Sequence, residues 1–353
     1  MKLKFFSCIA ASVLFCAGIS AQVFIIERGS TSLSYPNIKA AVDALQDNDQ
    51  LYLPPGEHSL KGYTWEGYEG TGNYSNILVV NKKVSIYGGG CANGANSTVL
   101  KDGTFVIGKD AGGSLITGIR FDGDFRLDNV SNCIVSRCLT TGSFDLYGAG
   151  DNNVITECEF KNSVYGNSSG YITNFGNGLS CIFSKCIFSS NINRLRASEV
   201  YNCIFTYVGS STPISPSSTC TFNNNIFIGS KTLTNQKISV TATGSTFSNN
   251  MWIGGEPSVS ATDNNTLNNN QITKELYANV FVDVDAGDYH LKDECKGKNA
   301  GTDGTDVGIY GTSVPFKENR LPLIPNFSLK AISPETNSAG KLPVNIVIDA
   351  QER

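Results

Sequence analysis

Charged residues are scarce in this sequence, and the few present do not favour the positive sign. Lys, Arg, Asp and Glu make up 16% of the 353 residues, and the formal net charge is −4. Proteins that bind nucleic acid or anionic membranes hold the phosphates with clusters of Lys and Arg. Because this chain has no such excess, we expect no nucleic-acid partner and no polybasic membrane contact.

Long hydrophobic runs are also missing after residue 21. A membrane-spanning helix needs roughly 18 or more consecutive apolar residues, and because no later segment approaches that length we expect no transmembrane span. The apolar runs are short, rich in Ile, Val and Phe, and separated by Gly, Asn and Ser. Helical repeats require amphipathic stretches of about ten residues or more with a 3.6-residue period, so this pattern predicts short β-strands instead.

Histidine and closely spaced cysteine pairs, the usual ligands of structural zinc, are scarce or missing. The chain has two histidines, His58 and His290, and no Cys-x-x-Cys pair. The sequence therefore predicts no metal site of this kind and identifies no cofactor. Asp303 and Asp306 are candidate Ca²⁺ ligands, although turn capping explains both with fewer assumptions.

What the sequence does contain is one irregular repeat between residues 115 and 252. Each copy has an apolar residue, a Cys or Asn three or four positions later and, in most copies, a large apolar residue two positions after that. The Cys or Asn positions are Cys138, Cys158, Cys186, Cys203, Asn225 and Asn250. They lie 20, 28, 17, 22 and 25 residues apart, and self-similarity in this range predicts a solenoid.

We interpret each copy as one turn of a coil made of short strands. Stacked coils pair their backbones about 4.8 Å apart and bury like residues over like, which places the Cys and Asn side chains in an internal ladder. Cys133 and Cys181 each lie five residues before such a position, and Cys220 precedes Asn225 in the same way. We expect cysteines fixed at repeat positions to be stacked core thiols rather than a disulfide framework.

The recurring Cys-x-Phe and Asn-x-Phe segments, for example at Cys158 and Asn225, resemble the right-handed parallel β-helix of the pectate-lyase-like superfamily. The resemblance covers most of the chain after residue 21. It implies an all-β fold: a single-stranded right-handed parallel β-helix solenoid with a short N-terminal capping helix and an extended C-terminal tail. It is also typical of exported bacterial proteins.

This interpretation divides the chain into four segments: a signal peptide at 1–21, an N-terminal cap and first strand at 22–60, the parallel β-helix at 61–311, and an extended, strand-like tail at 312–353. Lys2 and Lys4 before the apolar run 5–19, and a cleavage point after Ala21, indicate the signal peptide. Lipid attachment at Cys16 is the alternative. We expect an exported protein in the periplasm, on the cell surface or outside the cell.

Both ends of the predicted solenoid have signals of their own. Asn37 is placed to cap a short helix in which Ile38, Ala41, Val42 and Leu45 share one face. Such a helix would cover the open apolar end of the coil stack. At the other end, residues 281–311 resemble the closing coil of exported β-helix proteins.

A lateral row of outward side chains is where the sequence predicts function. Period-two alternation in the first strand of each coil, with strands expected at Ile172 and Leu195 among others, points these side chains away from the core. The row contains Asp124, Arg126, Asp128, Asp145, Tyr147, Thr173, Arg194, Arg196, Ser215 and Ser239. The resemblance implies that this sheet forms a saccharide groove.

The residue types in the row suit two reactions on an acidic glycan. A uronate lyase needs a cation and a base near the sugar, for which Arg126, Asp145, Arg194 and Arg196 are the catalytic candidates. A glycoside hydrolase needs two carboxylates roughly 5–9.5 Å apart. However, the sequence has no polygalacturonase-like Asp-Asp pair and no Gly-His-Gly segment, and an exposed ion pair explains Arg126 and Asp145 equally well.

We therefore expect an exported β-helix protein that contacts polysaccharide or a cell-surface glycan through its lateral sheet, without clear catalytic machinery. The expected ligand-binding residues are Asp124, Arg126, Asp128, Asp145, Tyr147 and Arg196. One alternative is a polysaccharide lyase or glycoside hydrolase that acts on an acidic glycan. A structural or adhesive surface protein is the other.

Overall fold

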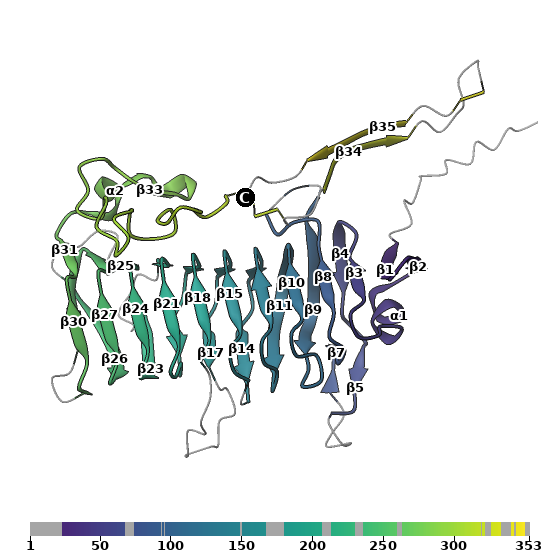
Figure 1. Ribbon diagram of the computed structural model, residues 1–353, viewed down its shortest axis with the longest axis horizontal. Coiled ribbons are helices and arrows are strands. Elements are labelled where there is room, and N and C mark those ends of the chain that lie inside the picture. The colour runs from purple at the N-terminus through teal and green to yellow at the C-terminus, as the bar shows by residue number, and fades with distance from the viewer. Residues whose placement is uncertain are drawn as a thin grey trace, which may run out of the picture.

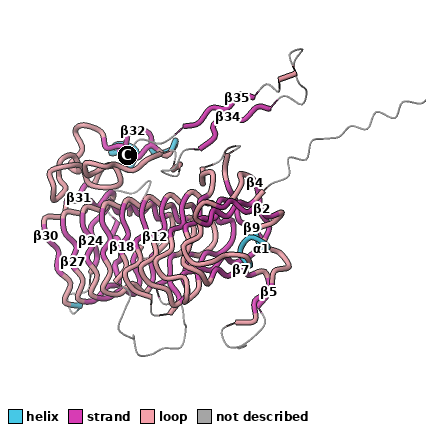
Figure 2. Tube along the Cα trace, turned by 45° about the vertical axis from the view of Figure 1, so that its right-hand side comes forward, coloured by secondary structure: helices cyan, strands magenta, loops and turns pink. Residues whose placement is uncertain are grey.

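Three parallel β-sheets wind around one hydrophobic core in this chain (Figures 1 and 2). A computed structural model describes residues 23–321, with gaps at 68–73, 93, 95, 149, 167–179, 207–212, 230–235, 260–262 and 319, and then residues 326–332, 340–341 and 344–349. The predicted signal peptide, Cys16, Ile172 and Thr173 lie outside the described residues. The predicted parallel β-solenoid is confirmed.

Each coil contributes strands to three faces of the solenoid, which we call sheets 1, 2 and 3. Sheet 1 consists of β3 (Gln50–Tyr52), β8 (Ser85–Tyr87), β10 (Leu115–Thr117), β12 (Ile134–Ser136), β15 (Val154–Thr156), β18 (Ile182–Ser184), β21 (Glu199–Tyr201), β24 (Thr221–Asn223), β27 (Thr246–Ser248) and β30 (Thr266–Asn268). Neighbours in this order pair in parallel without a register shift, so equivalent residues stack directly on one another.

Two long strands, β9 (Thr98–Ile107) and β11 (Ile119–Asp128), bend from sheet 2 into sheet 3. Sheet 2 contains their first halves and β4 (Gly56–Ser59), β13 (Leu139–Thr140), β16 (Glu159–Phe160), β19 (Ile187–Phe188), β22 (Ile204–Phe205), β25 (Ile226–Ile228), β28 (Met251–Ile253) and β31 (Gln271–Thr273). Sheet 3 contains their second halves and β7 (Ile77–Val80), β14 (Phe144–Tyr147), β17 (Val164–Gly166), β20 (Ile192–Asn193), β23 (Ile214–Ser218), β26 (Gln236–Thr243) and β29 (Gly255–Ser258).

The turn from sheet 1 to sheet 2 repeats one left-handed backbone residue in successive coils. These residues, with φ between 50° and 57°, are Arg137, Glu157, Lys185, Asn202, Asn224, Asn249 and Asn269. Asn enters this conformation more readily than most residues, which explains why it is common here. Because the conformation recurs at the same place in each coil, the turns stack and their side chains form an outward row.

Aromatic rings fill the core behind sheet 2. Phe160, Phe188, Phe205, Phe227 and Trp252 occupy the inward position of successive strands and are at most 2% exposed. Their ring centroids are stacked at 5.3, 4.8, 4.5 and 4.1 Å along this series. Each such pair contributes roughly 0.5–1.5 kcal/mol beyond the burial of its apolar area.

The predicted internal ladder of thiols and carboxamides is confirmed. The nine cysteines of the described region are free thiols, and all except the half-buried Cys295 are buried. The backbone N–H of Cys203 donates to Asn225 Oδ1 at 2.9 Å, and the N–H of Asn225 donates to Asn250 Oδ1 at 2.9 Å. Burial raises the pKa of the Cys158 thiol well above its usual value, so it stays protonated and donates to a backbone carbonyl. The ladder therefore satisfies buried polar groups coil by coil.

The N-terminal end of the stack is covered as predicted. An antiparallel pair, β1 (Phe24–Arg28) and β2 (Thr31–Tyr35), extends sheet 1, and helix α1 (Ile38–Asp43) follows it. The Asn37 side chain accepts a hydrogen bond from the N–H of Ala40 at 2.9 Å, while Ile38, Ala41 and Val42 are buried. Each of these contacts was expected from the capping residue and the apolar spacing.

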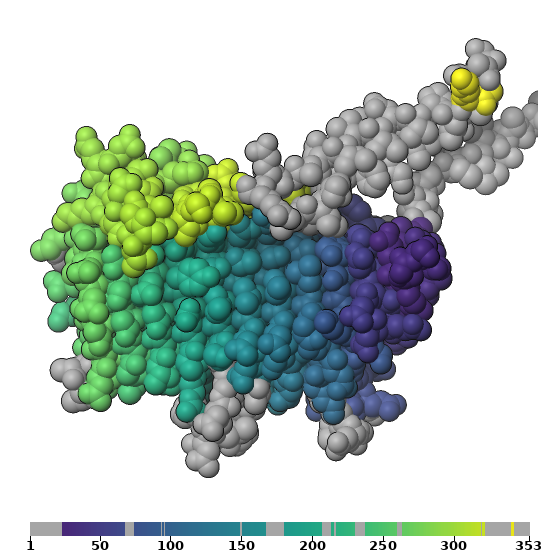
Figure 3. All heavy atoms as spheres, viewed as in Figure 1, coloured from purple at the N-terminus to yellow at the C-terminus, as the bar shows by residue number. Residues whose placement is uncertain are grey.

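The C-terminal residues do not form the closing coil that the resemblance implied for 281–311. After β31 the chain forms α2 (Tyr277–Val280), β32 (Phe281–Asp283), the 3-10 helix η3 (Val284–Ala286) and β33 (Asp288–Leu291), and β32 and β33 pair antiparallel. Residues 277–318, 320 and 321 then run back over the outside of sheet 2 (Figure 3). We call these residues the cover.

The outward row of turn side chains holds the cover in place. Four side chains of this row donate to backbone carbonyls of the cover, and later residues of the cover contact earlier coils. The pairs are Asn249 with Ala300, Asn202 with Gly308, Lys185 with Val314 and Arg137 with Leu321. Beyond the cover, β34 (Asn326–Ile332) and β35 (Val344–Asp349) form an antiparallel pair. A further small antiparallel pair, β5 (Thr64–Trp65) and β6 (Tyr74–Ser75), lies near β7.

Replacing Asn250 by alanine should destabilise the protein by about 2–4 kcal/mol, because it leaves several buried groups without partners. Asn250 is fully buried; it accepts from the N–H of Asn225 and donates to the carbonyl of Phe222 at 2.8 Å. Chemical denaturation measures the loss. Asn268→Ala, at an exposed position of the last strand of sheet 1, is the control and should change stability by less than about 0.5 kcal/mol. Equal effects of the two substitutions would contradict the ladder.

Candidate functional site

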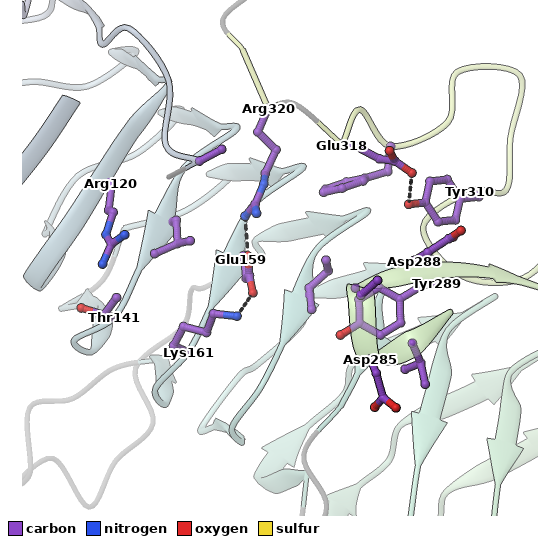
Figure 4. A pocket seen from close by; sticks show the side chains of 17 residues that line it. Arg120, Thr141, Glu159, Lys161, Asp285, Asp288, Tyr289, Tyr310, Glu318 and Arg320 are labelled. Atoms are coloured by element: carbon purple, nitrogen blue, oxygen red, sulfur yellow. Dashed lines mark hydrogen bonds and ion pairs between the residues drawn. The ribbon is translucent and has the colours of Figure 1, made fainter. Parts of the chain in front are cut away.

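A cavity on the described surface lies between the outer face of sheet 2 and the cover (Figure 4). Its volume is about 700 Å³. One wall comes from β11, β13, β16 and β19, and the other from η3, β33 and the following part of the cover. We call this cavity the groove.

The groove lies where the charged residues Arg120 and Glu159 interrupt the otherwise apolar outward row of sheet 2. The apolar part of that row, Ile204, Ile226 and Met251, is buried against cover residues such as Leu291 and Ile309. In the preceding coils the same outward position is occupied by other residues. In register from β11 they are Arg120, Leu139, Glu159 and Ile187. The cover packs closely on the apolar part and leaves space around Arg120 and Glu159.

Glu159 is the centre of the sheet wall. Its carboxylate accepts from Arg320 Nη1 at 2.5 Å and from the ammonium of Lys161, its neighbour along the strand (Figure 4). Burial opposes ionisation of Glu159, but the charges of Arg320 and Lys161 outweigh it and hold the pKa of the carboxyl below its usual value. Two cations and one carboxylate give this end of the groove a net charge of +1. Arg120 adds a guanidinium, which pairs with Asp122 at 2.7 Å.

The cover wall has the opposite character. It presents the carboxylates of Asp285, Asp288 and Glu318 together with the phenols of Tyr289 and Tyr310 (Figure 4). Burial, and then the charge of Glu159, raise the pKa of Tyr289, so its hydroxyl is protonated and can donate. Tyr310 donates to Glu318 Oε1 at 3.0 Å.

The arrangement is suited to binding a polyhydroxylated ligand. Hydroxyl groups can accept from Lys161 and Arg120 and donate to the carboxylates opposite, while the tyrosine rings supply apolar faces. In contrast, Glu159 is tied to two cations. A carboxylate held ionised in this way has little tendency to take up a proton, which disfavours general acid–base chemistry at this position.

The lateral row predicted from the sequence lies on the outer face of sheet 3, and the structure brings its first members together. Strand pairing places Arg126 beside Asp145 and Asp128 beside Tyr147. The guanidinium of Arg126 lies 3.6 Å from Asp145 Oδ2 and 5.1 Å from the centroid of the Tyr147 ring. The exposed Asp124 is near enough to raise the pKa of Asp145.

Burial is the main cause of the electrostatic perturbations in this row. It raises the pKa of both Asp128 and Asp145, and in each case the charge of Arg126 partly opposes the shift. Nε of Arg126 is buried without a hydrogen-bond partner among the described atoms. The cluster therefore contains one cation, one aromatic ring and two carboxylates, Asp128 and Asp145, that are easier to protonate than usual.

Two later members of the row, Arg194 and Arg196, are not on the strand where the sequence placed them, whereas Ser215 and Ser239 lie on strands at the expected positions. The strand expected at Ile172 is instead β17 (Val164–Gly166), and the one expected at Leu195 is β20 (Ile192–Asn193). The outward residue next to Tyr165 is Asn193, not Arg194 or Arg196. Arg194 has a left-handed backbone, with φ of 60°, in the turn after β20. Arg196 forms a β-bridge with Ser218 and lies two coils away from Tyr147. Ser239 is exposed on β26. Ser215, on β23, pairs with Asn193 of β20.

The candidate Ca²⁺ ligands are engaged within the chain. Asp303 Oδ1 accepts from the N–H and the hydroxyl of Thr305, which caps a turn. Asp306 pairs with Lys298 at 3.1 Å and accepts from the N–H of Asn299. These are the contacts that turn capping predicts. His58 is buried, with Nε2 at 2.8 Å from the carbonyl of Pro54, and does not face the groove.

No protein-family model matches the chain, and no curated protein is significantly similar to it. In the part of the chain that the structure describes, no helix has the length and the apolar composition needed to cross a membrane.

Attachment of the cover beside the groove should weaken in acid because Glu159 has a lowered pKa. A carboxyl whose folded-state pKa lies below its unfolded value stabilises the fold above the unfolded value and loses this effect as the pH falls through the folded one. We expect amide hydrogen exchange of residues 310–321 to show a falling opening free energy as the pH drops below the ordinary value of 4.5. In Glu159→Gln the cover should be weakly held at every pH. The same pH dependence in both proteins would contradict the assignment.

Proposed function

We propose that this protein is exported and binds a polysaccharide chain without cleaving it, with the groove as the principal binding site. The observation that carries the proposal is that cationic side chains of sheet 2, which can donate to hydroxyl groups, face carboxylates and tyrosines of the cover across the groove. The signal-like N-terminal segment supports export. The resemblance of the coils to the pectate-lyase-like superfamily supports a glycan ligand, by analogy of fold alone.

The shape of the groove supports a chain-like ligand rather than a small, enclosed one. It is open to solvent and passes over the outward positions of four adjacent coils, Arg120 to Ile187, so a linear ligand can enter and leave along the surface. Its polar groups outnumber its apolar ones, which suits sugar hydroxyls. A pocket for an apolar small molecule is lined mostly by hydrophobic and aromatic side chains.

The cluster on sheet 3 supports the alternative function, a lyase or hydrolase that acts on an acidic glycan. Glycoside hydrolysis requires one protonated and one ionised carboxylate, and burial raises the pKa of Asp128 and of Asp145 toward the protonated form. Arg126 stands beside both carboxylates and would attract an anionic sugar. We rank this function second because the described row places Arg194 and Arg196 away from the cluster. A structural or adhesive role is the third.

Electrophoresis through gels that contain neutral or uronate-bearing polysaccharides tests the binding proposal. The wild-type protein should be retarded, and the affinity measured from the retardation should be about tenfold or more lower in Lys161→Ala, because a charge-assisted hydrogen bond is worth roughly 1.5–3 kcal/mol. Lys161 is half-exposed, and Arg320 still holds Glu159 in this variant, so the fold should survive. Lys39→Ala removes an exposed lysine from α1 and should bind normally.

Two results would overturn the proposal in favour of a named alternative. Release of an unsaturated sugar product, followed by absorbance with and without Ca²⁺, that disappears in Arg126→Ala would establish the lyase. Neither retardation nor turnover with any polysaccharide would favour the structural role. Retardation that is equal in the wild type and Lys161→Ala would move the binding site away from the groove.

A further inference from the structure

Three potential metal ligands converge at the rim of the groove, on the face of the cover. The ligand atoms of Asp288, His290 and Glu318 all lie within 4.8 Å of one another. His290 Nδ1 is 2.6 Å from Asp288 Oδ1 and 3.9 Å from Glu318 Oε1. We propose that these three side chains bind a divalent transition-metal ion such as Zn²⁺.

Local structure explains why the three ligands meet. Asp288 and His290 are two residues apart on β33, and alternation along a strand puts such side chains on the same side. The preceding hairpin fixes this strand through the pairing of Asp283 with Asp288 and a left-handed turn at Gly287, with φ of 82°. Glu318 comes from the later part of the cover, which passes over the same face.

Tyr310 holds two of the ligands in place. Its ring stacks on the imidazole of His290 with centroids 3.6 Å apart, and its hydroxyl donates to Glu318 Oε1 at 3.0 Å. The backbone N–H of His290 also donates to Asp288 Oδ1 at 2.9 Å. Partners of this kind orient metal ligands and reduce the entropy lost when the ion binds.

The charge of the cluster is complementary to a dication. In the described part of the chain, the ion-pair partner of both Asp288 and Glu318 is His290, and neither carboxylate has a Lys or Arg within pairing distance. With a neutral imidazole, two carboxylates remain to be balanced.

The distances fit a small ion after modest movement. Ligand atoms about 2.0–2.1 Å from a tetrahedral Zn²⁺ lie roughly 3.4 Å apart. The 2.6 Å contact between His290 and Asp288 must therefore open, and the 3.9 Å separation of His290 from Glu318 must close, each by less than about 1 Å. The ligand atoms of Asp288 and Glu318, which lie within 4.8 Å of each other, must approach by up to about 1.4 Å. His290 and Glu318 are exposed enough to move this far. A fourth position faces solvent and suits water or a ligand hydroxyl.

The donor set selects the kind of metal. Imidazole nitrogen favours Zn²⁺, Co²⁺, Ni²⁺ or Cu²⁺, whereas Ca²⁺ requires six to eight oxygen ligands and Mg²⁺ prefers oxygen in octahedral geometry. One nitrogen and two carboxylates cannot satisfy Ca²⁺ here. The site is distinct from Asp303 and Asp306, which cap turns elsewhere in the cover.

Isothermal titration of the folded chain from residue 22 onward, stripped with EDTA and kept reduced, tests the proposal with Zn²⁺ alone. We expect one Zn²⁺ per chain, no comparable binding of Ca²⁺, and an affinity at least about tenfold lower in both His290→Ala and Glu318→Gln. The second variant keeps an oxygen that accepts from Tyr310, so it guards against simple misfolding. Asp293→Asn, at an exposed carboxylate nearby, should bind as the wild type does.

Co²⁺ distinguishes this site from the thiols. The account predicts visible d–d bands without a thiolate-to-metal charge-transfer band, because the ligands are nitrogen and oxygen. A thiolate band, the absence of any Zn²⁺ binding, or unchanged binding in both variants would overturn the proposal. None of these outcomes bears on polysaccharide binding, which is measured in EDTA with the metal absent.

Discussion

In-register stacking of equivalent residues is the constraint on which the rest of this structure depends. Each parallel strand places its side chains directly over those of the previous coil, so a residue type that fits once must fit again one coil later. Thiols and carboxamides can be stacked in the interior because each can form hydrogen bonds with the next coil, as Asn225 does with Asn250. Aromatic rings can repeat in the core behind sheet 2 because they stack face to face.

The same constraint decides where the molecule can bind a ligand. A row of apolar residues on the outside of sheet 2, including Ile204 and Ile226, cannot stay in water at no cost, and the cover buries it. Where Arg120 and Glu159 interrupt this row, the ion pair between Arg320 and Glu159 holds the cover, and the cover stands away from the sheet. The groove is a consequence of these charged residues in the outward row.

The sequence was sufficient for features that repeat with the chain and insufficient for features that join distant segments. The ladder positions and the Asn37 cap follow from spacing and local propensity. The strand position predicted at Ile172, from a fixed spacing before the next Cys, was wrong. The 28-residue interval after Cys158 includes an insertion, and the strand comes earlier, at Val164–Gly166. Glu159 and Arg320 meet although 161 residues separate them, and no periodicity predicts that contact. The one available signal was a charge at an otherwise apolar outward position.

Counting the reactive thiols tests the stacked core most directly. A chain that begins at residue 22 contains the nine cysteines of the described region, eight of them buried and Cys295 half-buried. The account predicts that a thiol reagent such as DTNB modifies at most one of them promptly in the folded protein, and all nine after denaturation. Several thiols reacting at once in the folded state, or fewer than nine after denaturation, would show that the cysteines do not form a buried, unbridged ladder.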